Sequence, residues 1–114
     1  MNAQILKEKI ESIPSLTNSK WEMYDVLNGK ITRCTNNSIW HFTPPDDIHD
    51  EPEIWTGHWK KLSEDKISID RIDVGPQHRH DTYEAIFAGL DVMVVSGNDE
   101  VRDNRIIIGI RSKT

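Results

Sequence analysis

Apolar residues near the start of the chain follow a helical pattern. They recur at spacings of three and four residues: Ala3, Leu6, Ile10 and Ile13. This spacing puts them on one side of a helix, with Asn2 as the capping residue and Pro14 as the stop. We therefore expect an amphipathic helix over residues 2–13. A helix this short is marginal alone, so its apolar side should pack against the rest of the protein.

Beyond Pro14 the apolar residues form short stretches that are typical of β-strands. Two of them, Trp21–Leu27 and Lys30–Thr35, flank the dipeptide Asn28-Gly29, which favours the type I′ turn of a β-hairpin. A two-residue loop sets the register of the predicted pairs: Tyr24 with Arg33, Val26 with Ile31, and Met23 with Cys34. A third strand at Ser38–Phe42 should continue an antiparallel meander.

A second hairpin is predicted over Ile54–Leu62 and Lys66–Val74, joined across Ser63-Glu64-Asp65. The apolar residues of its second strand switch from odd to even positions: Ile67 and Ile69, then Ile72 and Val74. In an unbroken strand they would face opposite sides of the sheet. We therefore expect a bulge or bend near Asp70-Arg71.

The last third of the chain predicts a short helix and two strands. Asp81-Thr82-Tyr83-Glu84 has the pattern of a helix capping box, and Gly89 can end that helix. Strands follow at Asp91–Val95 and Arg105–Arg111, and the run Ile106–Ile110 is apolar on both faces, as in a central strand covered on both sides. The predicted fold is α+β: one domain over residues 1–114, in which an N-terminal helix and a possible second short helix pack on a mostly antiparallel twisted sheet.

The composition favours a small globular protein over membrane, disulfide-rich and nucleic-acid-binding classes. The chain has 114 residues, of which 36% are hydrophobic and 29% charged, which suits a small globular domain. It has no apolar run of the roughly 20 residues that a membrane span needs, and its first residues lack the apolar stretch of a signal peptide. The single cysteine, Cys34, excludes an intramolecular disulfide, so we expect a cytoplasmic protein. A net charge of −5 argues against direct binding of nucleic acid.

All of the excess negative charge lies between Thr43 and Glu53. This segment has five acids and no base, whereas the rest of the chain has 14 acids and 14 bases. Its three prolines should keep it out of a sheet, so we expect an exposed acidic loop at 43–53. The loop could be merely solvated, could dock a basic protein, or could hold a metal on Asp47, His49 and Asp50.

Trp55 and Trp59 directly follow the acidic segment. Tryptophan in a domain this small is usually a core residue, but one beside a charged loop could anchor a partner. The predicted partner-binding residues are Asp46, Asp47, Asp50, Glu51, Glu53, Trp55 and Trp59.

His78, His80 and Glu84 are the residues best suited to a metal site. On an unbroken strand their side chains would share one face, and two imidazoles with a carboxylate can bind a divalent transition metal. The stretch from Gly75 to Glu84 resembles the first half of the cupin metal motif, in which His-x-His is followed by Glu. That resemblance implies a β-barrel with an oxygenase, isomerase or binding function. The motif's second half, a Pro-x-Gly turn followed by a further His, does not occur here.

These observations lead to two main functional hypotheses. The favoured one is a small acidic protein without enzymatic activity or cofactor that binds and inhibits a basic, nucleic-acid-acting protein, by analogy of size and charge with toxin-immunity and phage anti-defence proteins. The alternative is a cupin-like enzyme or binding module with a divalent transition metal on His78, His80 and Glu84. If Glu84 belongs to the capping box, that metal site does not form. A structural subunit without chemistry of its own is a third interpretation.

Overall fold

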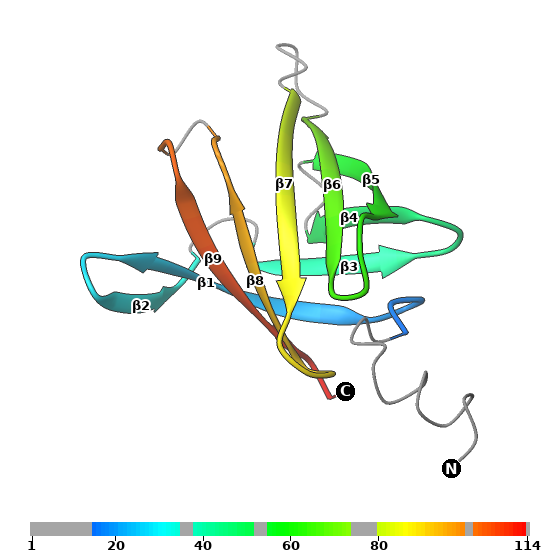
Figure 1. Ribbon diagram of the computed structural model, residues 1–114, viewed down its shortest axis with the longest axis horizontal. Helices are drawn as coiled ribbons and strands as arrows, with labels where there is room; N and C mark the ends of the chain where they lie inside the picture. The colour runs from blue at the N-terminus through cyan, green and yellow to red at the C-terminus, as the bar shows by residue number, and fades with distance from the viewer. Residues whose placement is uncertain (1–14, 35–37, 52–54, 74–79, 100–101, 114) are drawn as a thin grey trace.

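The computed structural model describes residues 15–34, 38–51, 55–73, 80–99 and 102–113. These residues contain nine β-strands and no helix (Figure 1). The strands are β1 Lys20–Leu27, β2 Lys30–Arg33, β3 Ile39–Thr43, β4 Asp47–Glu51, β5 Trp55–Lys61, β6 Lys66–Asp73, β7 His80–Phe87, β8 Val92–Gly97 and β9 Arg105–Arg111. Within the described ranges there is accordingly no helix that could cross a membrane.

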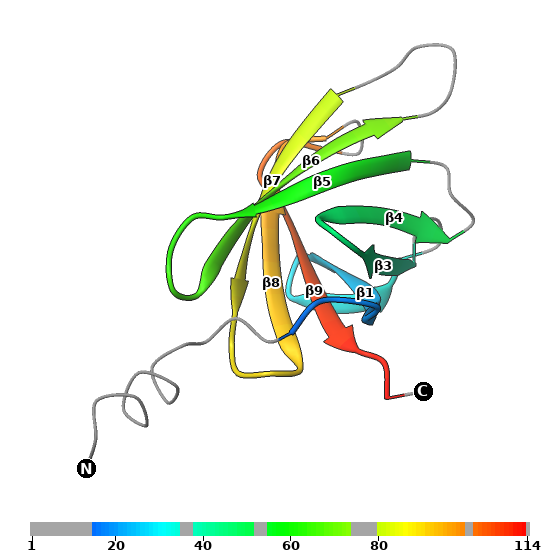
Figure 2. The same cartoon turned by 90° about the vertical axis from the view of Figure 1, so that its right-hand side faces the viewer.

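The strands form a closed antiparallel barrel. From β3 to β9 each strand pairs with the next, and β1 closes the ring by pairing with β9 on one edge and β3 on the other (Figure 1, Figure 2). β2 lies outside the ring, which the other eight strands form. β2 pairs with residues 24–27 of β1, and β3 pairs with residues 20–22 on the same edge. The predicted meander is therefore wrong at one point, because β3 pairs with β1 and not with β2.

Large side chains fill the barrel. Aromatic residues of β1, β3, β5 and β7 point inward and are at most 4% exposed: Trp21, Trp40, Phe42, Trp55, Tyr83 and Phe87. Several of these rings meet edge to face; the centroids of Trp40 and Trp55, for example, are 5.2 Å apart. Because these rings occupy the interior, the barrel is a packed core and not an open lumen.

The predicted α+β fold is wrong, because the segment expected to form a second helix is a strand. Buried and exposed residues alternate along the whole of β7. This period of two allows β7 to pair with β6 and β8, and it outweighs the capping-box pattern of Asp81 and Glu84. The predicted N-terminal helix, residues 2–13, lies outside the described residues.

Both predicted hairpins are confirmed. Asn28 and Gly29 have φ angles of 52° and 76°, as a type I′ turn requires. The register is the expected one: Tyr24 with Arg33, and Val26 with Ile31. The N–H of Cys34 donates to the carbonyl of Met23 at 3.1 Å, which extends the same register by one step. The second hairpin joins β5 to β6.

The predicted bulge in β6 is wrong. β6 pairs without interruption with both β5 and β7. The parity of its apolar residues changes because Arg71 points inward and is 4% exposed, whereas Ile72 points outward and is 42% exposed. Arg71 tolerates this position because it has a buried hydrogen-bond partner in Tyr83.

The predicted loop at 43–53 is wrong for residues 47–51. Residues 47–51 form β4, which lies between β3 and β5 in the sheet. Pro44 and Pro45 lie in the turn before β4, where a missing N–H interrupts no ladder. Ile48 and Asp50 face the interior and are fully buried, so the acidic residues of this segment do not share one surface.

β9 differs from its prediction in one respect. The prediction that its apolar run is covered on both faces is wrong. The inward residue Ile107 is buried, but Ile106 and Ile110 face outward and are 37% and 36% exposed.

Candidate functional site

The structure separates the predicted partner-binding residues into buried and exposed ones. Asp50 and Trp55 are both 0% exposed, and the N–H of Trp55 donates to Oδ1 of Asp50 at 2.9 Å. The Trp55 ring also lies 5.2 Å from Trp40 and beneath the guanidinium of Arg71. Both residues are therefore core residues, and neither is available as a surface contact.

The remaining residues of that set lie nearer the surface. Asp46 is exposed and Asp47 and Glu51 are half-buried, while Trp59 is partly buried against Phe42. Glu51 forms an ion pair with Lys20 at 2.9 Å, and this contact lowers the pKa of the Glu51 carboxyl. Glu53 lies outside the described residues.

His80 and Glu84 lie on the outer face of β7. Four residues along a strand correspond to about 13 Å, so their side chains do not converge on one point. Nε2 of His80 is 3.9 Å from Asp70, and the Glu84 carboxylate is 3.7 Å from Lys66. His78 lies outside the described residues.

Cupins are jelly rolls with Greek-key connections, whereas β3 to β9 follow one another in a meander, so the topology does not support the resemblance.

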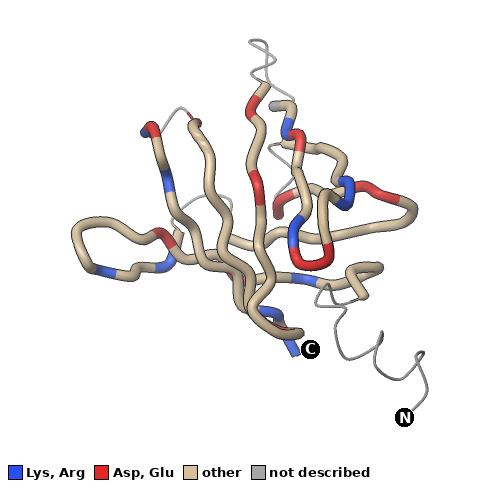
Figure 3. Tube along the Cα trace, viewed as in Figure 1, with Lys and Arg blue, Asp and Glu red and all other residues tan. Residues whose placement is uncertain are grey.

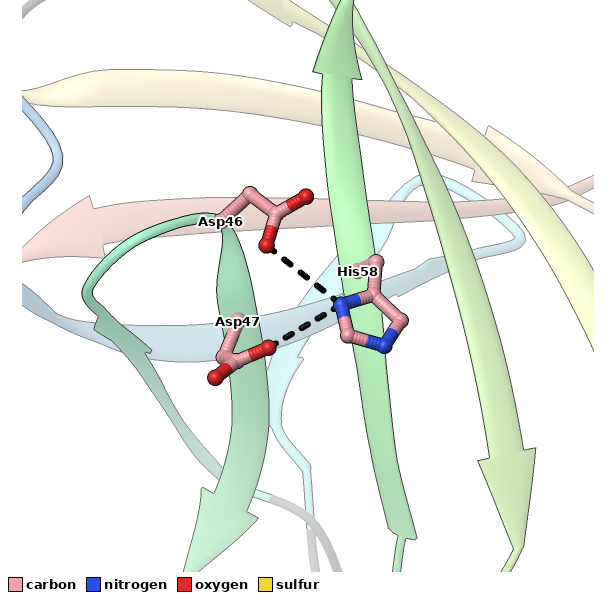
Figure 4. Close-up of side chains that lie close together, drawn as sticks. All are labelled: Asp46, Asp47 and His58. Atoms are coloured by element: carbon pink, nitrogen blue, oxygen red, sulfur yellow. Dashed lines mark ion pairs between the residues drawn. The ribbon is translucent and has the colours of Figure 1, made fainter.

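A different group of potential metal ligands lies together on the outside of the barrel. Nδ1 of His58 is 3.0 Å from Oδ1 of Asp47 and 3.5 Å from Oδ1 of Asp46 (Figure 4). Asp47 and His58 face each other across β4 and β5, and Asp46 is the last residue of the preceding turn. The sequence does not predict this group, because a loop at 43–53 would have no register with β5.

Two further histidines lie next to this group. His41 and His49 face each other across β3 and β4, with ring centroids 4.9 Å apart. Burial and the adjacent His49 lower the pKa of His41, so its imidazole is neutral at neutral pH.

A second polar cluster lies inside the barrel. Arg71 donates to the hydroxyl of Tyr83 at 3.0 Å, and that hydroxyl donates to Asp99 at 2.8 Å. Arg105 donates to the same Asp99 oxygen at 2.8 Å. Burial raises the pKa of the Tyr83 phenol, so it stays protonated. Burial would also raise the pKa of Asp99, but its hydrogen bonds to Arg105 and Tyr83 keep that pKa below the usual value.

Asp25 extends the cluster to the seam between β1 and β9. Arg102 donates to both carboxylate oxygens of Asp25, at 2.6 and 3.1 Å. This bidentate contact, helped by Arg105, lowers the pKa of Asp25.

A small cavity borders the interior cluster. Its lining residues are Met23, Cys34, Trp40, Arg71, Tyr83, Arg105 and Ile107, and it has room for about one water molecule. Burial raises the pKa of the Cys34 thiol, which keeps the sulfur in its unreactive form. This cavity is too small to bind an organic substrate.

An apolar patch on the outside of the barrel is centred on β8 and β9 and includes the adjoining parts of β7, β1 and β2. Cross-strand pairing places Ile86, Val94, Ile108 and Tyr24 in one row. Neighbouring rows add Val92, Ile110, Ile106, Val26 and Ile31. We call these nine residues the apolar face. Ile31, Ile86, Val94, Ile106 and Ile110 are 36–60% exposed. β8 carries no charged residue, and those of β9 lie only at its ends (Figure 3).

Comparison with protein-family models, curated proteins and solved structures gave no match.

Proposed function

We propose that the protein acts by binding a basic protein, and that the apolar face is its contact surface. The observation that carries this proposal is that the side chains of the apolar face are contiguous across five strands, β7, β8, β9, β1 and β2. Adjacent apolar side chains on an exposed sheet face are typical of interaction surfaces, whereas exposed apolar residues scattered singly are common in any protein.

The charge of the chain supports a basic partner. With a net charge of −5, the protein attracts a positively charged molecule over long range and repels both nucleic acid and a second copy of itself. Inhibition of a nucleic-acid-acting enzyme is the activity we propose for the complex, because such enzymes carry basic surfaces. A cytoplasmic location is part of the proposal, and the free thiol of Cys34 supports it.

The proposed contact residues differ from those predicted from the sequence. Asp50 and Trp55 are buried, so the anchor moves from the acidic segment to the apolar face. The described acids Asp46, Asp47 and Glu51 remain at or near the surface, where they act on the rate of association rather than as the central contact.

Two matched isoleucines provide the test. Ile86 belongs to the apolar face and is 44% exposed, while Ile72 is 42% exposed on β6 between the polar residues Thr56 and His80. Changing each to Asn leaves the net charge unaltered. A partner is captured from source cells with wild-type protein, purified, and measured by surface plasmon resonance. We expect Ile86→Asn to weaken binding by about ten-fold or more and Ile72→Asn by less than about two-fold.

Three results would contradict the proposal. One is a captured partner that is acidic. Another is equal affinity of the wild type and Ile86→Asn for the purified partner. The third is a wild-type dimer in sedimentation that Ile86→Asn converts to a monomer, since the apolar face would then bind a second copy. If the partner is a nucleic-acid-acting enzyme, wild-type protein should also lower its activity, and Ile86→Asn should do so less.

A further inference from the structure

We propose that Asp46, Asp47 and His58 bind a divalent transition-metal ion of the Zn²⁺ type. Three potential ligand atoms, one from each residue, lie within 4.8 Å of one another on the outside of the barrel. They combine one imidazole nitrogen with two carboxylate oxygens, which are first-row transition-metal ligands. The proposal is independent of the apolar face.

The distances from His58 Nδ1 to the two carboxylates fall in the range of ligand separations around a bound ion. Zinc–nitrogen and zinc–oxygen bonds are about 2.0–2.2 Å long, so neighbouring ligands are about 3.3–3.6 Å apart in a tetrahedral site and about 2.8–3.1 Å apart in an octahedral one. The distances from His58 Nδ1 to Asp46 and Asp47 are 3.5 and 3.0 Å. The two carboxylate oxygens lie within 4.8 Å of each other, and rotation of the exposed aspartate side chains can bring them into the same range.

A metal ion could contact all three ligand atoms at once, whereas a hydrogen on His58 Nδ1 cannot. Nδ1 of His58 carries at most one hydrogen, so it can donate a strong hydrogen bond to only one of the two carboxylates (Figure 4). A divalent cation between the three atoms neutralises both carboxylates at once. It also binds the imidazole nitrogen through its lone pair.

The backbone of all three residues is held by the sheet. Asp47 and His58 are a cross-strand pair, and the N–H of Trp59 donates to the carbonyl of Asp46 at 3.0 Å. The side chains of Asp46, Asp47 and His58 are 54%, 41% and 65% exposed, so an ion can enter from solvent. Water then completes its coordination on the open side.

The ligand set also predicts which ions bind. For a site with nitrogen and oxygen ligands, affinity rises from Mn²⁺ to Cu²⁺ and is lower again for Zn²⁺. Zn²⁺ should still bind more tightly than Mn²⁺. Mg²⁺ and Ca²⁺ prefer oxygen ligands throughout and should bind most weakly.

The test is a calorimetric titration of the chelator-stripped 114-residue chain with each metal salt. We expect one Zn²⁺ per chain, with the affinity lowered about ten-fold or more by His58→Ala and by Asp47→Asn. His80→Ala is the matched control. His80 is similarly exposed, at 61%, but it lies near a single described carboxylate, that of Asp70 at 3.9 Å. Circular dichroism checks that each variant folds.

A second measurement locates the ion. On addition of Zn²⁺, the Nδ1 resonance of His58 should shift in ¹⁵N NMR spectra, while the imidazole nitrogens of His80 should not. Absence of saturable Zn²⁺ binding overturns the proposal. So does wild-type affinity in both His58→Ala and Asp47→Asn, or an equal loss in His80→Ala. Loss of binding in His49→Ala with His58→Ala unaffected would also overturn it, by assigning the ion to the His41–His49 pair.

Discussion

Tyr83 illustrates how one buried residue links charges that would otherwise be unstable inside the barrel. Its hydroxyl accepts from Arg71 and donates to Asp99, and the ring is 1% exposed. Because Arg71 and Asp99 are also nearly fully buried, each depends on protein partners in place of bulk water. Tyr83 therefore has a structural role that its position in the sequence does not reveal.

Replacing Tyr83 by Phe should lower the free energy of unfolding by about 1–3 kcal/mol, because Arg71 and Asp99 each lose a buried hydrogen bond. Tyr24→Phe is the control, since Tyr24 is only half-buried on the outer face, and we expect a change within about 0.5 kcal/mol. Urea denaturation measures both. Equal effects of the two changes would show that the Tyr83 hydroxyl contributes nothing specific.

At the scale of elements, the β1–β2 hairpin depends on its turn. β2 has four residues, all of them exposed, and it lies outside the closed ring. Packing therefore contributes little to holding β2 in place. The backbone conformation of Asn28 and Gly29 and the pairing with β1 are what position it.

Gly29→Val should accordingly destabilise the protein by about 1 kcal/mol or more. A Cβ at Gly29 would meet no atom within 4 Å, so the whole effect comes from the positive φ of 76°, which a β-branched residue adopts poorly. Thr32→Val on the same strand is the control, because a β-branched residue suits an extended backbone. Chemical denaturation distinguishes them, and a neutral Gly29→Val would refute this account of the turn.

At the scale of the whole molecule, the barrel is closed by pairing between β1 and β9, and charged residues reinforce that seam. Asp25 of β1 contacts both Arg102, just before β9, and Arg105, at its start. Gly109 of β9 leaves room for the Met93 side chain next to this seam, since an added Cβ would lie 2.9 Å from Met93 side-chain atoms. Closure thus joins residues about 80 positions apart in the sequence.

The charge contacts at the seam should make stability depend on pH in the acid range. The pKa of Asp25 is lowered by folding, so its contribution is fully present above the unfolded value of 3.8 and is lost as the pH falls through the folded value. The pKa of Asp99 is also lowered by folding, so its contribution to stability is lost in the same way as the pH falls. We expect the unfolding free energies of wild type and Asp25→Asn to differ most near neutral pH and to converge below about pH 4. A difference that stays constant from pH 7 to about pH 2 would contradict this.

Local features of this protein were predictable from sequence because they depend on residues a few positions apart. The Asn28-Gly29 turn, the β5–β6 hairpin and the approximate positions of β8 and β9 belong to this class. Each is specified by turn residues flanked by apolar stretches, and neighbouring strands at a tight turn pair with little loss of chain entropy.

The tertiary structure decided the features that depend on distant partners. β7 is a strand because β6 and β8 take up both of its edges, and β4 is a strand because β3 and β5 do the same. Asp50 and Arg71 are buried because each has a hydrogen-bond partner inside the barrel, Trp55 and Tyr83 respectively. The grouping of Asp46 and Asp47 with His58 likewise exists only through the β4–β5 register. Sequence patterns report what a residue and its near neighbours prefer, whereas cross-strand register and burial are set by the closed barrel.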